Sequence, residues 1–385
     1  MQRMKRMGVV VLLGCQAAAT QKVEITAPAT ATVSAPQTPP PSVATAFAFV
    51  GKLAPGVTAQ AFRLGHSVAV VQSSEHGWTV TAIGADRHRV DLTTKIDAKK
   101  RTADLPVLFV GGSAADDAWI SFRSDDVPLL DEGTWHVTSG DVTRSSKRYL
   151  AIGALHADQW VALPTRKPPA YLYDDDPSKF EWLHGTGDLP MVPANVRLFD
   201  VAFLGAGRVC GVGLVHSKAS ETQAVLWTGG PNGASRTWPV GPIQDASMNV
   251  VRGSEGDCVI VTASAPPPFT HSATSFARIQ GDALASVKVD ECHATLATAT
   301  PRGIWLYDDD KRAIYRAELA ANVAMTVVAF PAGLGECTKI VEVTSLVALD
   351  DNDVWATARC DGDGLGERLL HTEPVGTVDS WPAPP

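Results

Sequence analysis

One short pattern repeats along most of this chain, and it constrains the fold more than any other feature. The clearest copy, residues 198–239, reads as four short apolar strands separated by turn residues, at 199–204, 209–213, 224–227 and 236–238. A second copy lies at the C-terminal end. Three pairs of residues keep nearly the same separation between the copies: Cys210 with Trp355, Trp227 with His371, and Trp238 with Trp381. One shared spacing can arise by chance, whereas three in register indicate a repeat.

The second strand of each unit carries one aromatic or apolar residue, which we call the landmark position. The seven landmarks are Val68, Trp119, Trp160, Cys210, Val259, Trp305 and Trp355. They are 41 to 51 residues apart, and the units show no helical periodicity. Repeated four-stranded units predict an all-β fold, namely a seven-bladed β-propeller of four-stranded antiparallel blades, with six or eight blades as alternatives. In such a ring each sheet covers its neighbours.

Tryptophans are expected to pack between the blades. We assign this role to the four landmark tryptophans, with stacking on a ligand as the alternative; they are Trp119, Trp160, Trp305 and Trp355. Two further tryptophans, Trp135 and Trp182, are assigned to the fourth strands of blades two and three by analogy with Trp238.

The N-terminal residues predict an export signal. Arg3, Lys5 and Arg6 precede a short apolar run at 8–13, which is much shorter than the roughly 20 residues of a membrane-spanning helix. The Leu-Leu-Gly-Cys sequence at 12–15 resembles a bacterial lipobox, which implies a signal peptide at 1–14 and a lipid on Cys15. An ordinary cleaved signal is the alternative. Gln16 replaces the Asp that retains some lipoproteins in the inner membrane, so the outer membrane is the expected location.

Residues 15–44 are rich in Ala, Thr, Pro and Gln. Such a segment cannot bury enough apolar surface to offset the entropy lost on ordering, so we expect the acylated cysteine to be followed by a disordered tether. The propeller is expected to occupy 45–385. Lipid on Cys15 would then be the means of holding the protein at a membrane.

The final unit resembles the blades of loosely repetitive propellers found in exported bacterial lipoproteins. The similarity rests on Asp-Val-Trp-Ala at 353–356, Leu-Leu-His at 369–371 and Trp381. It weakens toward the N-terminus, where 65–68 matches poorly. The resemblance implies a propeller fold and a cell-envelope location. It implies no activity, because that group of proteins is defined by repeat shape.

Charge and motifs exclude several functions. The chain has 33 Lys and Arg against 41 Asp and Glu, a net charge of −8, which argues against nucleic-acid binding. It has no Gly-x-Ser-x-Gly motif and no phosphate-binding glycine loop. Its histidines are scattered singly. An enzyme is therefore not favoured, although propeller enzymes assemble their sites from several blades.

No cofactor or metal site is expected from the acidic clusters. Those at 174–176, 308–310 and 361–364 resemble partial calcium loops. None completes the twelve-residue loop, so solvated hairpin turns are expected, with calcium as the alternative.

Five cysteines remain besides Cys15. Export would place them in an oxidising compartment, and their odd number leaves at least one free. Cys337 and Cys360 flank the first two strands of the last unit, so antiparallel pairing would bring them together as a disulfide. Cys210 occupies a landmark position and is interpreted as a small buried apolar residue.

The sequence predicts a monomeric, lipid-anchored binding or scaffold protein of the cell envelope whose partner is an unknown protein or glycan. The hairpins between second and third strands share one face of a propeller, and their lengths vary here. We expect partners to bind this face near His216, Phe269, His271 and Asp363. The alternatives are a hydrolase or lyase acting on a glycan or peptide, and a non-enzymatic subunit of an envelope assembly.

Overall fold

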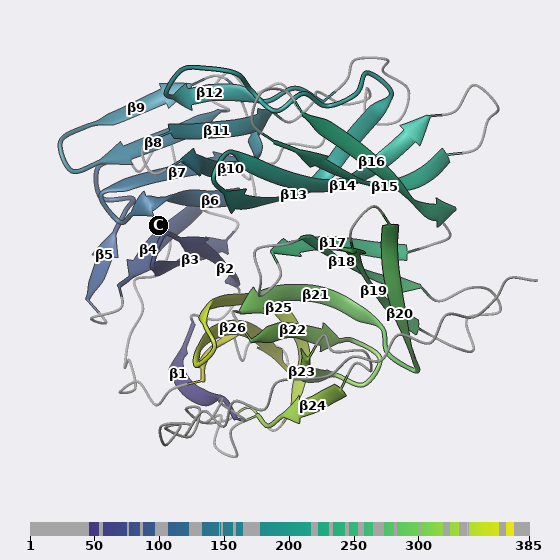
Figure 1. The fold of residues 1–385 in the computed structure, drawn as a ribbon. Helices are drawn as coiled ribbons and strands as arrows, with labels where there is room; N and C mark the ends of the chain where they lie inside the picture. The colour runs from purple at the N-terminus through teal and green to yellow at the C-terminus, as the bar shows by residue number, and fades with distance from the viewer. Residues whose placement is uncertain are drawn as a thin grey trace, which may run out of the picture. The chain divides into compact units, whose positions relative to one another are not determined.

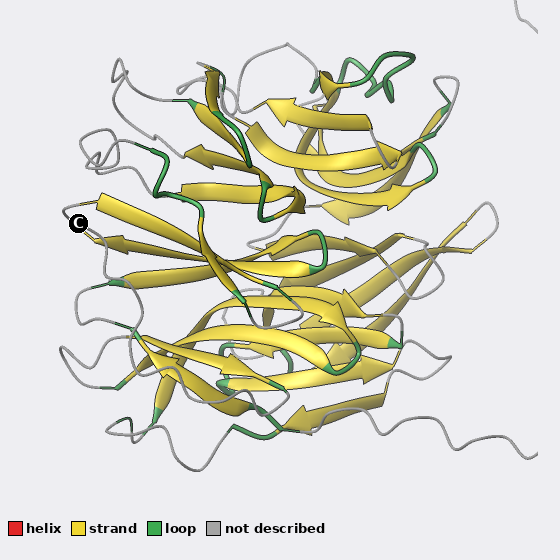
Figure 2. Ribbon diagram, turned by 90° about the vertical axis from the view of Figure 1, so that its left-hand side faces the viewer, coloured by secondary structure: helices red, strands yellow, loops and turns green. Residues whose placement is uncertain are grey.

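The computed structural model describes residues 46–372, interrupted at several connections between strands, of which the longest are 97–106, 123–132 and 165–177. Every element in these residues is a β-strand (Figure 2). Residues 43–385 form one compact unit, and residues 1–42, a second unit, lie outside the described part. In the part described, no helix is long and apolar enough to cross a membrane.

The strands form seven antiparallel sheets, numbered here as blades in chain order. Blades one to three comprise β2 (Thr58–Leu64), β3 (Ser67–Ser74), β4 (Gly77–Ile83) and β5 (Arg89–Asp91); β6 (Val107–Ala114), β7 (Asp117–Phe122), β8 (Thr134–Thr138) and β9 (Val142–Ser145); and β10 (Tyr149–His156), β11 (Gln159–Pro164) and β12 (Glu181–His184). Blade three thus has three strands, because 185–195 run on to β13 without forming a fourth.

The remaining blades each have four strands. Blades four to six comprise β13 (Val196–Gly205), β14 (Arg208–His216), β15 (Thr222–Gly229) and β16 (Ser235–Pro242); β17 (Ala246–Arg252), β18 (Cys258–Ser264), β19 (Ala273–Gln280) and β20 (Ala283–Asp290); and β21 (Ala294–Thr300), β22 (Gly303–Asp308), β23 (Ala313–Glu318) and β24 (Ala324–Val328). Blade seven comprises β25 (Ile340–Asp350), β26 (Asp353–Cys360), β27 (Glu367–His371) and, from the other end of the chain, β1 (Ala48–Lys52).

The first strand of each blade lines the centre of the ring. Each of these inner strands contacts the inner strand of the next blade, in the order β2, β6, β10, β13, β17, β21, β25 and back to β2. The circle of contacts is therefore complete, and the prediction of a seven-bladed propeller is confirmed.

The ring closes through a strand from the N-terminal end. The sequence places the fourth strand of the last blade near Trp381, but β1 occupies that position and pairs with β27 through Ala48–His371 and Phe49–Leu370 (Figure 1). Trp381 lies outside the described residues. Since β1 precedes the first blade in the chain, it joins the last blade to the first covalently.

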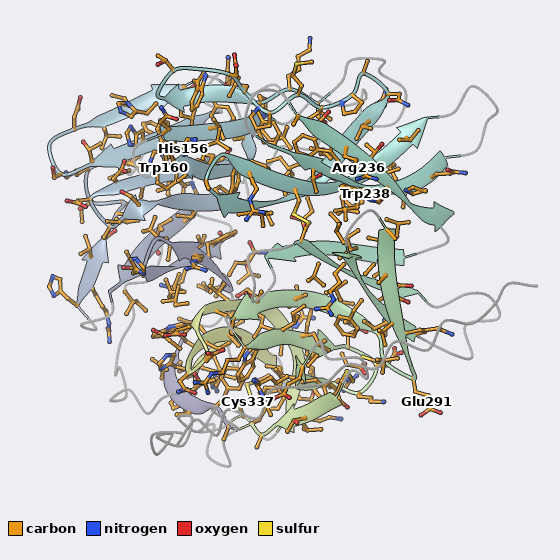
Figure 3. The ribbon with its side chains drawn as sticks, in the orientation of Figure 1. His156, Trp160, Arg236, Trp238, Glu291 and Cys337 are labelled. Carbon is orange, nitrogen blue, oxygen red and sulfur yellow. A yellow bond between two sulfur atoms is a disulfide. The ribbon has the colours of Figure 1, made fainter. Side chains whose placement is uncertain are left out.

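All seven landmarks lie in second strands, which confirms the repeat. Trp135 and Trp182, however, lie in the third strands β8 and β12, so their assignment to fourth strands is wrong. The strand register explains the error. Trp135 and Trp182 pair with the residue that follows the landmark in the second strand, and this is the position that Trp227 occupies in the third strand of blade four. Fourth-strand Trp238 has the Arg236 guanidinium 5.0 Å from its ring centre (Figure 3).

The core lies between blades as much as within them. Trp305 is fully buried in a cluster that joins blades six and seven, and Trp355 belongs to a cluster that joins blades seven and one. Trp119 and Trp160 are partly buried against a smaller cluster in blade three, with Trp160 labelled in Figure 3. Burial between neighbouring sheets is the role that stabilises each blade in a ring.

The described residues contain two disulfides. Cys337 and Cys360 are bonded within blade seven, and Cys210 is bonded to Cys258, which links blade four to blade five. Cys210 is buried, as interpreted from the sequence, but it is one half of a disulfide. Cys292 is the free cysteine of the described residues, and burial raises the pKa of its thiol to about 11, which keeps it protonated at neutral pH.

Removing the disulfide of blade seven with the double change Cys337→Ser and Cys360→Ser is expected to lower the free energy of unfolding by about 3 kcal/mol. The bond closes a segment with a sequence separation of 23 residues and so restricts the unfolded chain. Urea unfolding of the oxidised protein and the variant measures the difference. A loss below about 1 kcal/mol would show that the β25–β26 pairing alone holds this segment.

Candidate functional site

The two faces of the ring carry different connections. We call the face with the hairpins between second and third strands the loop face, and the face with the turns between first and second strands the turn face. The β22–β23 hairpin at 309–312 lies on the loop face, whereas the Gly205–Gly207 turn between β13 and β14 lies on the turn face. Connections between consecutive blades return to the loop face, where each inner strand begins.

A pocket of about 540 Å³ opens at the start of the inner strands of blades six, seven and one. Its wall comprises Gln60 of β2, Thr295 and Leu296 of β21, Tyr307 of β22, Asp309 and Arg312 of the β22–β23 hairpin, and 341–344 of β25. Its volume lies within the range of small-molecule sites, roughly 300–1,000 Å³. Since every wall segment lies at the loop-face end of its strand, the pocket is on the loop face.

The acidic groups of the pocket already have partners. The Asp309 carboxylate lies 2.8 Å from His293 Nδ1, and the Glu342 carboxylate is paired with the Arg359 guanidinium. Arg312 is exposed, and its guanidinium makes no hydrogen bond or ion pair to a described residue. Its backbone has a φ of 53°, a left-handed conformation that is uncommon for a non-glycine residue. Arg312 is thus a cation of the pocket wall that has no acidic partner among the described residues.

The buried wall of the pocket contains an unpartnered hydroxyl. Tyr307 is 1% exposed, and its hydroxyl makes no hydrogen bond of ordinary geometry among the described residues. Burial raises the pKa of Tyr307, and a nearby backbone group of Val343 opposes the shift. Tyr307 lies two residues after its landmark, where blades two and seven have Ser121 and Thr357. The hydroxyl has almost no accessible surface, so Tyr307 belongs to the packed boundary between blades six and seven rather than to the open part of the pocket.

A buried carboxylate lies behind one wall of the pocket. Glu367, at the start of β27, is 3% exposed, and its Oε2 accepts hydrogen bonds from the Ala59 amide at 2.8 Å and the Thr344 hydroxyl at 3.2 Å. Ala59 belongs to blade one, so this carboxylate bridges the seam where the ring closes. Burial raises the pKa of Glu367 to about 7, although both hydrogen bonds lower it.

At other boundaries between blades, hydroxyl groups accept hydrogen bonds from the backbone of inner strands in the same way. Ser121 Oγ accepts a hydrogen bond from the Tyr149 amide at 2.9 Å, and Thr274 Oγ1 accepts one from the Ala294 amide at 3.0 Å. Both amides belong to the first residue of an inner strand. Glu367 is the charged member of this group, so the seam between blades seven and one is the one expected to respond to pH.

Glu367→Gln is expected to remove a pH dependence of stability. The folded-state pKa of about 7 lies above the ordinary value of 4.5, so the folded protein holds this proton more tightly than the unfolded chain. The stabilising contribution is complete below pH 4.5 and is lost as the pH rises through 7, a total change of about 3 kcal/mol for this shift. Urea unfolding at pH 5 and pH 8 should show this difference, and the variant should lack it. The control Glu318→Gln changes an exposed carboxylate and should retain the pH dependence of stability. Identical pH profiles of stability for the parent and both variants would refute the raised pKa of Glu367.

One acidic cluster lies beside the pocket. His293, Asp309 and Asp310 offer ligand atoms within 4.8 Å of one another, so together they could hold a metal ion. Ca²⁺ prefers six to eight oxygen ligands, and an imidazole with two exposed carboxylates fits that preference poorly. The 2.8 Å contact between His293 and Asp309 accounts for the arrangement as a hydrogen bond. Of the other predicted acidic turns, 174–176 and 362–364 lie outside the described residues.

On the turn face, two blades share an Asp-His-Trp arrangement. His136 stacks on Trp119 with ring centres 3.8 Å apart and contacts the Asp117 carboxylate at 2.7 Å. In blade seven, His371 and Asp353 make the same contact at 2.9 Å beside Trp355. Each histidine lies in the third strand of its blade, directly opposite the landmark tryptophan of the second strand. This arrangement explains the recurring Asp, Trp and His of the repeat as packing.

The carboxylate in blade two also carries a pKa shift. Burial acts to raise the pKa of Asp117, but hydrogen bonds with His136 and Ser113 outweigh it, so the pKa lies below its ordinary value. A carboxylate that stays ionised in the folded protein stabilises the strand ends that hold it. The shift is therefore consistent with a structural role.

The residues predicted for the binding face are mostly beyond what the structure describes. The backbone of His216 ends β14 at the loop face. Phe269 and His271 belong to the connection between β18 and β19, and Asp363 to that between β26 and β27; all three lie outside the described residues, as does Cys15. The pocket residues were not predicted from the sequence, because they come from three blades.

Comparison with known proteins gives similarity in structure alone. No protein-family model and no curated protein matches the sequence. Virginiamycin B lyase from Staphylococcus aureus is 9% identical over 86% of this chain and 96% of its own, with a TM-score of 0.41. The WD40 domain of Toxoplasma gondii coronin is 9% identical over 87% and 91%, with a TM-score of 0.44. Regucalcin from Agrobacterium tumefaciens is 10% identical over 89% and 100%, with a TM-score of 0.43.

Proposed function

We propose that this protein is a monomeric binding protein of the cell envelope, anchored by lipid on Cys15 and using the loop face to hold its partner. The observation that supports this function best is the pocket on the loop face, where polar groups from three blades converge. The lipobox at 12–15 supports export and an outer-membrane location. The tether at 15–44 would let the propeller reach partners away from the lipid surface.

The arrangement favours binding over hydrolysis. A glycoside hydrolase of the common type needs two carboxyl groups flanking the scissile bond. In the described pocket wall, Asp309 contacts His293 and Glu342 pairs with Arg359, and Glu367 lies behind Thr344 rather than on the wall. A hydrolase or lyase therefore remains the alternative, and turnover of an added glycan would establish it.

The lipid anchor makes a direct prediction. Cys15→Ala should move the protein from the membrane fraction to the soluble fraction, because the tether that follows is too polar to hold a membrane. Fractionation of cells expressing either form, followed by immunoblotting, measures the change. If the variant stays in the membrane fraction as the parent does, the lipobox assignment is wrong.

The binding face can be tested with the Cys15→Ala protein and delipidated cell-envelope fragments. Reversing charges on the loop face with Lys311→Glu and Arg312→Glu should reduce sedimentation with the fragments at least tenfold. Changing the turn face with Ala206→Glu and Arg208→Glu should leave sedimentation intact, since both residues are exposed on the opposite side. The reverse pattern, with loss only on the turn face, would contradict the proposal.

A further inference from the structure

The seam between blades seven and one is held by side chains of blade seven that accept hydrogen bonds from the backbone of β2. The Ala59 amide donates to Glu367 Oε2 at 2.8 Å, and the Ala61 amide donates to Ser345 Oγ at 2.7 Å. These two amides are buried, so their hydrogen bonds depend on the seam staying closed. Of the two acceptors, Glu367 is the one that can carry a charge.

Glu367 ends a row of three charged side chains that crosses blade seven. Arg359 pairs with Glu367 in the register of β26 with β27, and with Glu342 in the register of β25 with β26. Directly opposed residues of antiparallel strands point to the same face, so Arg359 lies between the two carboxyl groups. The Arg359 guanidinium forms an ion pair with Glu342, and Glu367 forms no ion pair with a described residue. The row is therefore balanced while Glu367 holds a proton.

The other charged groups of these strands leave that balance unchanged. Lys52 of β1 is exposed, and Arg368 projects from the opposite face of β27, because successive residues of a strand alternate. The charged or titratable residues at the far, turn-face ends of the strands are Arg63, Asp350, Asp353 and His371. Arginine and lysine keep their charge between pH 5 and pH 8. At the loop-face end of the seam, Glu367 is thus the described group whose ionisation can change the balance in that range.

We propose that loss of the proton from Glu367 opens this seam at its loop-face end, so that β2 separates from blade seven while the other boundaries between blades stay closed. A carboxylate anion in the seam would be buried without an ion pair, which is costly. By leaving the seam, the anion would reach both water and the exposed guanidinium of Arg359. This inference goes beyond the proposed function and does not depend on what the loop face binds.

The direction of the pH response follows from the burial of Glu367. Burial raises its pKa to about 7, above the ordinary value of 4.5, so the closed seam holds the proton more tightly than the open one. The seam is therefore tight at acidic pH and loosens as the pH rises through 7. Gln60 and Thr344 line the pocket from opposite sides of the seam, so the opening would also separate two parts of the pocket wall.

Residue-resolved amide hydrogen exchange of the purified full-length protein tests the proposal, because exchange reports local opening. Protection factors, corrected for the intrinsic effect of pH on exchange, are measured at pH 5 and pH 8. The Ala59 and Ala61 amides should be about 50-fold less protected at pH 8. The Tyr149 and Ala294 amides are matched controls, since each donates to a hydroxyl at another boundary between blades, and their protection should change by no more than about threefold.

Two variants separate the role of Glu367 from other effects of pH. Glu367→Gln should keep the Ala59 and Ala61 amides protected at pH 8, because a neutral amide oxygen can still accept the hydrogen bond from Ala59. Glu318→Gln, which changes an exposed carboxylate of blade six, should behave as the parent does.

Three results would overturn the proposal. An equal loss of protection at Ala59, Ala61, Tyr149 and Ala294 would assign the effect of pH to global unfolding. A loss at Ala59 that persists in Glu367→Gln would assign the effect to another group. Unchanged protection of Ala59 and Ala61 in the parent between pH 5 and pH 8 would show that the seam stays closed when Glu367 is ionised.

Discussion

Replacing Val50 with aspartate is expected to lower the free energy of unfolding by about 4 kcal/mol, because the change opens the joint that closes the ring. Val50 lies in β1, is 2% exposed, and packs in the cluster that joins blades seven and one. A carboxylate there would lose the apolar contacts and would be buried without a cation. The β27 strand, buried along its length, would then lose the partner that covers its outer edge.

Urea unfolding monitored by tryptophan fluorescence measures this effect, and limited proteolysis shows where the chain opens. The variant should be cleaved near β1 at low protease concentration, well before the rest of the propeller. Lys52→Gln is the matched control, since Lys52 lies in the same strand but is exposed. If Val50→Asp is as stable as Lys52→Gln, β1 does not close the ring.

Trp305→Ala is expected to cost about 3–5 kcal/mol of unfolding free energy. Trp305 is fully buried between blades six and seven, and its ring makes an edge contact with Phe47, with centroids 5.9 Å apart. Removing a buried indole loses its transfer free energy and leaves a cavity that neighbouring strands cannot fill. Phe47 precedes β1, so the same change should also weaken the closing strand.

Trp119→Ala provides the comparison for this prediction, because Trp119 is also a landmark but remains partly exposed beside His136. Its expected cost is about 1–2 kcal/mol. Both costs are measured by urea unfolding under the same conditions. Equal costs for the two changes would mean that the landmark tryptophans do not differ in burial, contrary to the structure.

Much of the fold could be predicted because each repeat unit has a local pattern of apolar and turn residues that is visible in the sequence. Each landmark residue lies in a second strand, and alternating apolar residues mark the strands that flank it. The sequence could not show that β1 completes blade seven, since this pairing joins residues that are hundreds of positions apart. It also placed Trp135 and Trp182 one strand too late, because tryptophan serves in both third and fourth strands.

The candidate site was harder to predict than the fold. The Arg312 and Tyr307 side chains lie in blade six and Gln60 in blade one, and the ring brings them to one pocket. No spacing in the sequence links them, and each alone reads as an ordinary surface or core residue. Glu367 likewise reads as a charged residue after a glycine-rich turn, and only the seam with Ala59 shows that it is buried.

The most direct test of the central claim, that the loop face is the binding face, is site-specific photo-cross-linking in intact cells. A photoreactive residue is placed at Lys311 on the loop face or at Ala206 on the turn face, both of which are exposed. The account predicts that the Lys311 probe forms adducts with envelope material and that the Ala206 probe does not. Adducts from Ala206 without adducts from Lys311 would contradict it.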